Sequence, residues 1–345
     1  MRAHRGRLPA VVGALVAPLL AVAGGTAAQG DRTGPGPDAA PSVTRVVVIS
    51  VDGLNPRALE RLGPRGTPVL HRMMRQGATT LNARTERELT TTLPNHTGMV
   101  TGLRVEAATG GHGVTWNDER LRPPTVQAAA GRPVSSVFNV VHDAGMSTAL
   151  FAAKRKFSLW TRSWPDAIGI SKIAAEDDAA VLRAARAELV SAPPNLAFVH
   201  LAGPDLAGHD HGFLSPAYLR AVTVADRRVG RILAAIQDSG QAEETMIVLT
   251  SDHGGARPGH YDPSRLANFR VPFFVTGPDV PAGTDLYDLN PHYRDPGTRR
   301  TGYVATRAPI RNGDLANLVT DVLGLPALSR SEHDAEQDLD VFADR

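Results

Sequence analysis

RVVVISVDGL, residues 45–54, constrains the architecture of this chain more than any other segment. Its first seven residues are dominated by Val and Ile, which is typical of a parallel strand covered on both faces. The run stops at Asp52 and Gly53, a carboxylate followed by a residue that suits a tight turn. Because ligands gather at the carboxyl ends of parallel strands, we expect Asp52 to lie at a functional edge of a sheet.

Strand and helix patterns alternate through the rest of the chain. Further apolar strands are expected over residues 147–153, 195–203, 245–251 and 271–277. Helices are expected over residues 56–76, 175–190, 215–240 and 312–324. Alternation of this kind predicts a doubly wound, mostly parallel α/β sheet flanked by helices.

Composition narrows the chemistry that the chain can perform. With 345 residues, of which 42% are hydrophobic, the chain is long enough for one large domain with an ordinary core. It contains no cysteine, so it has no disulfides, no thiolate metal ligands and no cysteine nucleophile. Any metal ion must therefore be held by His, Asp or Glu side chains.

Residues 1–28 have the pattern of a secretory signal peptide, with a basic start, an apolar stretch and a small-residue cleavage site. A membrane anchor is the alternative, but Gly and Pro interrupt the apolar run. We therefore expect a secreted or extracytoplasmic protein without a stable membrane anchor. Removing the three arginines of the signal leaves 34 Lys and Arg against 35 Asp and Glu, so the net charge changes from +2 to −1. That balance argues against sequence-specific nucleic-acid binding.

Three of the expected strands lead into metal-ligand residue types. The first ends at Asp52, the second leads to Asp205 and His209, and the third ends at Asp252 and His253. Asp205 and His209 are four residues apart, so one helical turn can bring both to a single ion. Carboxylate and imidazole groups are ligands for Zn²⁺ and for borderline metals such as Mn²⁺. Two such sets suggest two ions, which together stabilise the attacking and leaving oxygens of a phosphoryl displacement.

The segment TTTLPNHTGMVTG, residues 90–102, offers a hydroxyl for such a reaction. Thr92 is the best-placed member, because Pro94 can begin a helix and leave Thr92 near its positive N-terminal end. That position favours an alkoxide and a bound phosphate. Metal coordination can deprotonate a threonine hydroxyl that is otherwise a poor nucleophile. Thr90 and Thr91 are interpreted as ordinary strand or loop residues.

Five motifs, taken in order, resemble those of the alkaline phosphatase superfamily and, within it, the type I phosphodiesterase/nucleotide pyrophosphatase family. They are VISVDGL, TTTLPNHTGMVTG, GHGVTWN, GPDLAGHDHG and LTSDHGG. The resemblance covers about residues 45–325. It implies an alkaline-phosphatase-like fold and a hydrolase that cleaves phosphodiester or pyrophosphate bonds in small phosphoester or nucleotide-like substrates.

The same resemblance implies two divalent metal ions, Zn²⁺ or alternatively Mn²⁺. Asp52, Asp252 and His253 would hold the ion that activates the threonine hydroxyl. Asp205, His209 and a later histidine would hold the ion that faces the leaving group and then the attacking water.

Further roles follow from the resemblance. Thr92 would bind the first ion and form a phosphothreonine intermediate, and Asn117 would donate a hydrogen bond to a phosphoryl oxygen. The later histidine is expected at His260 rather than His292, because DHGGARPGH is similar to the DHGG…GH arrangement of shorter superfamily members.

Domain boundaries follow from composition and from the extent of the motifs. Residues 29–43 are rich in Gly and Pro and are predicted to be a flexible leader. Residues 44–330 are expected to form the alkaline-phosphatase-like catalytic domain, and residues 331–345 a C-terminal tail. Apart from the strand expected over residues 271–277, the segment 256–310 carries no predicted structure, and the oligomeric state is not predicted.

Several alternatives stay open at this point. A phosphomonoesterase or phosphonate hydrolase could use the same site, and a secreted metal-dependent binding module is the non-enzymatic alternative. Family members often carry an aromatic residue where Leu93 stands, so a preference for nucleotides is not decided. The charged run KRK, residues 154–156, is interpreted either as an attractor of anionic substrate or as a solvated charge run.

Overall fold

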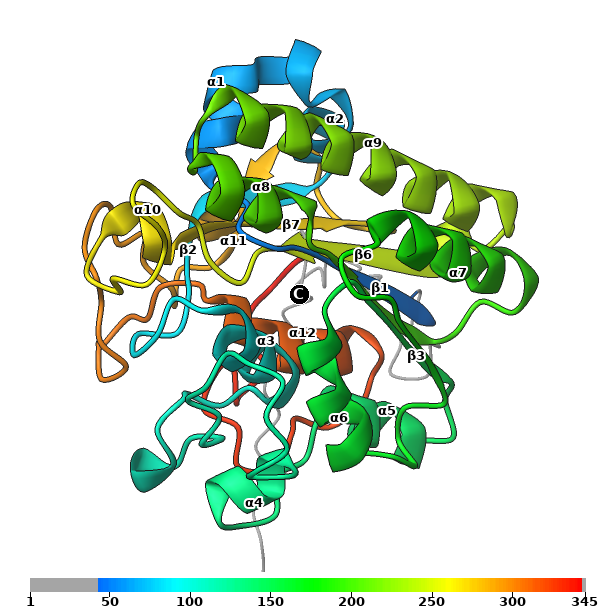
Figure 1. Ribbon diagram of the computed structural model, residues 1–345. Coiled ribbons are helices and arrows are strands. Elements are labelled where there is room, and N and C mark those ends of the chain that lie inside the picture. The colour runs from blue at the N-terminus through cyan, green and yellow to red at the C-terminus, as the bar shows by residue number, and fades with distance from the viewer. Residues whose placement is uncertain (1–42, 343–345) are drawn as a thin grey trace, which may run out of the picture. The chain divides into compact units, whose positions relative to one another are not determined.

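A sheet with strand order β4-β3-β5-β1-β6-β7-β2-β8 runs through residues 43–342, the part of the chain that the computed structural model describes (Figure 1). The predicted signal peptide (1–28) and all of the predicted leader except Val43 lie outside the described residues. The strands are β1 (Arg45–Val51), β2 (Ala78–Arg84), β3 (Thr148–Ala152), β4 (Ile170–Ile173), β5 (Leu196–Leu201), β6 (Thr245–Thr250), β7 (Arg270–Thr276) and β8 (Thr284–Asp285).

The larger part of this sheet is parallel. β1 pairs in parallel with β5 and β6, and β3 pairs in parallel with β5 and β4. β7 runs antiparallel to both β6 and β2. The prediction of a doubly wound, mostly parallel α/β sheet is therefore confirmed. Because the parallel strands are neighbours, the residues that follow β3, β5, β1 and β6 meet along one edge.

The central strand β1 shows why its sequence is apolar at almost every position. Val46 and Val48 belong to the core on one face of the sheet. Val47, Ile49 and Val51 belong to the core on the other face. Alternate side chains of a strand point to opposite faces, so a strand covered by helices on both sides needs apolar residues throughout.

Helices cover both faces of the sheet (Figure 1). One face is covered by α1 (Pro56–Gly66), α2 (Pro68–Gln76), α7 (Asp178–Ser191) and α9 (Pro216–Asp238), with α8 (Gly203–His211) at the edge. The other face is covered by α3 (Thr92–Thr101), α4 (Val126–Ala130), α5 (Val137–Asp143), α6 (Ser158–Ser163) and α12 (Leu315–Val322).

The segment 56–76 differs from its prediction as a single helix. The structure has α1 and α2 instead, separated at Thr67. Gly63 has a left-handed φ of 57° and Pro64 follows it directly, so the first helix is kinked before it ends. Pro68 then opens α2 at a position where the missing N–H costs nothing.

The later part of the chain completes the fold. The segment 256–310 contains α10 (Leu266–Phe269), β7, β8 and α11 (Leu286–Leu289). The predicted tail packs onto α12, where Asn317 donates a hydrogen bond to the carbonyl of His333, and Leu339 and Val341 are buried. Between residues 43 and 342, no helix is both long enough and apolar enough to cross a membrane.

Candidate metal centre

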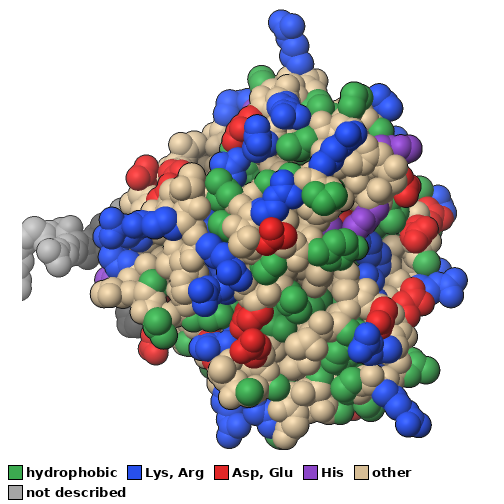
Figure 2. All heavy atoms as spheres, turned by 60° about the vertical axis from the view of Figure 1, so that its left-hand side comes forward, with side chains coloured by type: hydrophobic (Ala, Val, Ile, Leu, Met, Phe, Trp, Pro, Cys, Tyr) green, Lys and Arg blue, Asp and Glu red, His purple; other side chains and the backbone are tan. Residues whose placement is uncertain are grey.

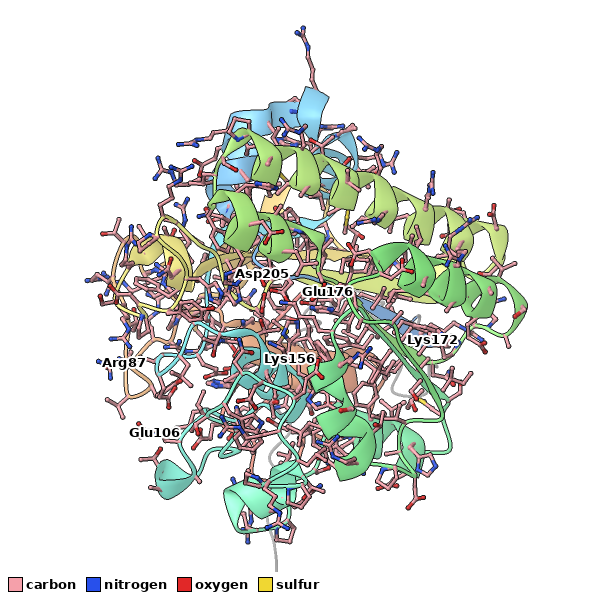
Figure 3. The ribbon with its side chains drawn as sticks, in the orientation of Figure 1. Arg87, Glu106, Lys156, Lys172, Glu176 and Asp205 are labelled. Carbon is pink, nitrogen blue, oxygen red and sulfur yellow. The ribbon has the colours of Figure 1, made fainter. Side chains whose placement is uncertain are left out.

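The carboxyl edge of the sheet gathers the predicted ligands. Asp52 follows β1, Asp252 and His253 follow β6, and Asp205 lies in the first turn of α8, which follows β5. In Figure 3, Asp205 lies near the middle of the view below α8 and Lys156 lies beside α3, whereas Lys172 lies farther out along the sheet. Parallel pairing of β1 with β5 and β6 therefore brings together residues that are up to 201 positions apart.

The first predicted ligand set is buried and closely spaced. Asp52, Asp252 and His253 are all fully buried, and their donor atoms form one group. Nε2 of His253 lies 3.5 Å from Oδ1 of Asp52 and 3.2 Å from Oδ2 of Asp252. Donors about 2.0 Å from a tetrahedral ion lie roughly 3.3 Å from one another, so these spacings suit one cation.

The second predicted set has similar spacing. Nε2 of His209 lies 3.4 Å from Oδ1 of Asp205 and 3.1 Å from Nε2 of His260. Nε2 of His260 lies 3.6 Å from the same oxygen of Asp205. His253 borders both sets, because its Nε2 also lies 3.9 Å from Oδ1 of Asp205. Asp205, His253 and His260 themselves form a second candidate metal group.

Each of the three carboxylates is held by one oxygen and leaves the other without a hydrogen-bond partner. In Asp52, Oδ2 accepts from Nε2 of His200 at 2.9 Å. In Asp252, Oδ1 accepts from the backbone N–H of Gly53 at 3.0 Å. The unpartnered buried atoms are Oδ1 of Asp52, Oδ1 of Asp205, Oδ2 of Asp252 and Nε2 of His253.

These unpartnered atoms are the same ones whose spacing suits a cation. A buried polar atom without a partner costs about 1–3 kcal/mol, and more when it carries charge. Two divalent cations at this edge would satisfy all four atoms at once. The donor set, made of carboxylate oxygens and imidazole nitrogens in a site without thiolates, therefore fits Zn²⁺ or a similar divalent ion.

The histidines are fixed in the form that binds metal. Nδ1 of His253 donates to the carbonyl of Gly254 at 2.9 Å, and Nδ1 of His260 donates to the carbonyl of Thr90 at 2.6 Å. Each Nε2 is thereby left with a free lone pair. Burial, with the neighbouring His253 second, lowers the pKa of His260 to about 3, and burial also lowers the pKa of His253. Both rings are therefore neutral at physiological pH, as metal ligands must be.

The pKa values of two of the buried aspartates, Asp52 and Asp252, are shifted in opposite directions. Burial and the charge of Asp52 raise the pKa of Asp252 well above its ordinary value. Burial also opposes the ionisation of Asp52, but Lys154 and His200 outweigh it and hold the pKa of Asp52 well below the ordinary value. Among the described residues, Lys154 is the lysine that contacts two of the three buried aspartates.

Thr92 is the first residue of α3, as expected from its position before Pro94, and it is almost fully buried. Its Oγ1 accepts a hydrogen bond from Nζ of Lys154 at 3.4 Å. The backbone N–H of Leu93 donates to Oδ1 of Asn117 at 2.9 Å, so Asn117 lies at the same helix end. Nζ of Lys156 donates to that oxygen as well, at 3.0 Å. The amide nitrogen of Asn117 is therefore the part of the side chain that remains to donate to a ligand.

Lys154 is the residue whose place the sequence left undecided. It follows β3 by two residues and is only 9% exposed. Its Nζ lies 2.7 Å from Oδ2 of Asp52 and 2.7 Å from Oδ2 of Asp205. Burial opposes its protonation, but these two carboxylates outweigh it and raise the pKa of Lys154. It is thus not part of a solvated charge run.

His200 is a second residue that sequence reasoning missed. It is the penultimate residue of β5 and is fully buried. The backbone N–H of Ala153 donates to its Nδ1 at 3.2 Å, so Nε2 carries the proton that it donates to Asp52. A histidine inside an apolar strand, just before a ligand-bearing segment, was the only signal that could have found it.

His292, the alternative to His260 as the later ligand, lies away from the predicted metal ligands. His292 is exposed and lines a separate cavity of about 570 Å³, together with Arg104, Tyr303 and His333. His333 lies 3.1 Å from Glu86. Of the later histidines His260, His292 and His333, the structure brings only His260 beside Asp205 and His209.

The surface of the described residues carries side chains of both charges. On the face shown in Figure 2, Lys and Arg side chains are interspersed with acidic and apolar ones. The exposed large hydrophobic residues of the described part are Leu121, Ile170, Val190, Tyr261 and Val304. Tyr261 directly follows the predicted ligand His260 and lies beside its ring at a centroid distance of 4.5 Å.

A doubly wound sheet with these donor groups beside a buried threonine is the arrangement that the resemblance to the alkaline phosphatase superfamily implies. The chain belongs to the type I phosphodiesterase/nucleotide pyrophosphatase family, whose family model matches residues 46–261.

Known relatives agree with this assignment. Ectonucleotide pyrophosphatase/phosphodiesterase family member 1 of Mus musculus is 26% identical over 223 residues, which are 60% of this chain and 24% of that protein. The chain thus spans about a quarter of the length of that relative. The fold is similar to that of murine ectonucleotide pyrophosphatase/phosphodiesterase 5, with a TM-score of 0.62 and 16% identity over 81% of this chain and 95% of the other. A structure of the inactive threonine-to-alanine variant of that protein in complex with AMP matches with a TM-score of 0.60.

Proposed function

We propose that this protein is an exported, metal-dependent hydrolase that cleaves phosphodiester or pyrophosphate bonds through a phosphothreonine formed at Thr92. One observation carries the proposal. Four buried donor atoms without hydrogen-bond partners lie at cation spacing, and Lys154 joins their carboxylates to the hydroxyl of Thr92. Buried polar atoms in folded proteins are normally hydrogen-bonded, so four unpartnered atoms at one place favour a site that binds a ligand.

The ligand sets in this proposal are those expected from the sequence. Asp52, Asp252, His253 and the hydroxyl of Thr92 would hold one divalent ion, and Asp205, His209 and His260 the other. Bound Zn²⁺ ions would supply Lewis-acid activation of the hydroxyl and charge for the leaving oxygen. His200 orients Asp52 through the oxygen that faces away from the ion.

The residues of the chain then account for the reaction in two steps. Oγ1 of Thr92 attacks phosphorus, so that a bond to threonine forms as the bond to the leaving oxygen breaks. Water next attacks the same phosphorus, the threonine oxygen leaves, and the hydroxyl is restored. The amide nitrogen of Asn117 would donate to a non-bridging oxygen, and the N-terminal end of α3 favours the negative charge. The AMP complex of the structural neighbour supports nucleotide-like substrates.

The proposal is tested by trapping the intermediate. Protein freed of metal and then loaded with Zn²⁺ is mixed with bis-p-nitrophenyl phosphate or a dinucleotide, quenched in acid and digested. Mass spectrometry is expected to find a p-nitrophenylphosphoryl group, or a nucleotidyl group when the dinucleotide is used, on the Thr92 peptide, and only after metal loading. Turnover without any phosphorylated threonine, or turnover that survives Thr92→Ala, would overturn the nucleophile assignment.

Export is a separate part of the proposal and is supported by the pattern of residues 1–28. N-terminal sequencing of protein recovered from the medium or periplasm is expected to begin just after Ala28. Recovery of Met1 in a membrane fraction would contradict it.

A further inference from the structure

One buried ammonium group, that of Lys154, contacts two of the three ligand carboxylates and the hydroxyl of Thr92. We infer that Lys154 is a specificity-determining residue that lets the site accept dianionic phosphoryl groups, so that phosphate monoesters are substrates as well as diesters. This inference rests on the function proposed above and specifies the substrate class of the same site. It is carried by the position of Nζ, 3.4 Å from Oγ1 of Thr92.

Lys154 and metal ions would use different atoms of the same carboxylates. Nζ contacts Oδ2 of Asp52 and Oδ2 of Asp205, each at 2.7 Å. The unpartnered atoms, which suit the cations, are Oδ1 in both residues. The ammonium therefore contacts carboxylate atoms different from those that suit the cations, so its contacts and the cations do not compete for the same oxygens.

The distance between Nζ of Lys154 and Oγ1 of Thr92 places the ammonium beside the position that the phosphoryl group of the substrate would take. A phosphorus atom bonded to Oγ1 carries its non-bridging oxygens within hydrogen-bond reach of a donor that already contacts Oγ1. A diester has two such oxygens and one negative charge, whereas a monoester has three oxygens and, above its second pKa of about 6, two charges. The third oxygen needs a further cationic donor, because an unpaired charge in a buried site is strongly unfavourable.

Lys156 lies beside Lys154 in sequence but acts differently. Its Nζ donates to the carbonyl of Asn117 at 2.8 Å and to Oδ1 of the same residue at 3.0 Å. It is therefore a positioning residue for the Asn117 amide. The amide would contact an oxygen that monoesters and diesters share, so loss of Lys156 should affect both substrate classes to a similar extent.

The test compares two substrates that have the same leaving group. Zinc-loaded wild type, Lys154→Gln, Lys154→Arg, Lys156→Met and Lys172→Met are assayed with p-nitrophenyl phosphate and methyl p-nitrophenyl phosphate near pH 8. Lys172 lies on the exposed strand β4 and serves as the control. The measured quantity is the ratio of kcat/KM for the monoester to kcat/KM for the diester.

Lys154→Gln is expected to lower this ratio by at least about tenfold, equivalent to ~1.4 kcal/mol. Lys154→Arg, which keeps the charge, should restore most of the ratio. Lys156→Met should lower both rates without changing the ratio, and Lys172→Met should change neither. Zinc content and far-UV circular dichroism of each variant identify proteins that have lost metal or failed to fold. If Lys154→Gln does not fold, the folded Lys154→Arg variant tests the inference: a retained ratio supports it and a lost ratio contradicts it.

Two results would count against the inference in distinguishable ways. Diester turnover with an unchanged ratio in Lys154→Gln would overturn the role of Lys154 and leave the proposed function standing. Absence of turnover of both substrates by zinc-loaded wild type would overturn the proposed function, and this inference with it.

Discussion

Nζ of Lys154 lies 2.7 Å from Oδ2 of Asp52, so a residue that follows β3 is joined to one that follows β1. The strand between them is β5, whose following helix supplies Asp205 to the same ammonium. One lysine therefore ties together the carboxyl ends of three neighbouring strands. The parallel pairing of these strands forms the edge of the sheet that carries the site. Ion pairs between the Lys154 ammonium and the two carboxylates stabilise that edge.

The choice between His260 and His292 can be tested by metal content. His260→Ala is expected to lose one of two bound zinc ions, because its Nε2 lies 3.1 Å from Nε2 of His209 and 3.6 Å from Asp205. His292→Ala, which changes an exposed side chain, serves as the matched control and should keep both ions. Zinc per chain is measured by atomic emission after dialysis. Full zinc content in His260→Ala would exclude it as a ligand.

His200→Ala should weaken metal binding without removing a ligand. His200 holds Oδ2 of Asp52 and so directs the other oxygen toward the cation position. Loss of a group that orients a metal ligand typically costs 10–100-fold in affinity. Competition with a zinc chelator gives the dissociation constant. An affinity equal to that of wild type would show that Lys154 alone orients Asp52.

Gly254→Ala is expected to destabilise the protein by about 1–3 kcal/mol and to weaken binding of the first ion. A Cβ at Gly254 would lie 2.2 Å from the carbonyl oxygen of Ala267, and backbone cannot give way as a side-chain tip can. Gly254 directly follows His253, so relief of this clash displaces the ligand. Gly302→Ala is the control, because a Cβ there meets nothing within 4 Å. Urea unfolding and zinc titration of both variants provide the comparison.

The buried pair of His333 and Glu86 predicts how stability depends on pH. Burial opposes protonation of His333, but Glu86 outweighs it and raises the pKa of His333 above its ordinary value. Burial and the charge of Asp314 raise the pKa of Asp334 to about 8. A raised pKa means that the folded protein holds the proton more tightly than the unfolded chain does. The stabilisation is complete below the unfolded pKa and is lost as the pH rises through the folded one.

The free energy of unfolding should therefore decrease between about pH 5 and about pH 9. In His333→Gln the decrease above the ordinary histidine pKa of 6.5 should be smaller. The control is His142→Gln, at a side chain that is about half exposed, and it should follow the wild-type curve. Urea unfolding across this range measures the effect, and identical curves for wild type and His333→Gln would contradict it.

Much of the fold and of the candidate site could be predicted from local sequence. The run at β1 is apolar at almost every position because both faces are covered, and that pattern is visible without a structure. The donors Asp52, Asp205 and Asp252 each come soon after such a strand, so the rule that ligands gather at the carboxyl edge was enough to bring them together. The Gly-Pro pair at residues 63 and 64 is likewise a local signal for the helix break that the structure shows there.

Lys154 and His200 could not be assigned in the same way. Lys154, like the aspartates, follows a strand at the carboxyl edge of the sheet. In the sequence, however, it stands in a run of three cationic residues, which is also typical of a solvated surface. Only its contacts in the structure distinguish a site residue from a surface residue. His200 lies inside the apolar pattern of β5, where the sequence gives no partner. Its role depends on the register that places it beside Ser50, two residues before Asp52.

The central claim is that two divalent cations are held beside the hydroxyl of Thr92. A crystal structure of the zinc-loaded protein, with anomalous diffraction recorded above and below the zinc edge, tests it most directly. We expect two anomalous peaks, one contacted by Asp52, Asp252, His253 and Thr92, and one contacted by Asp205, His209 and His260. A single peak, peaks at other residues, or a Thr92 hydroxyl that contacts neither ion would contradict it.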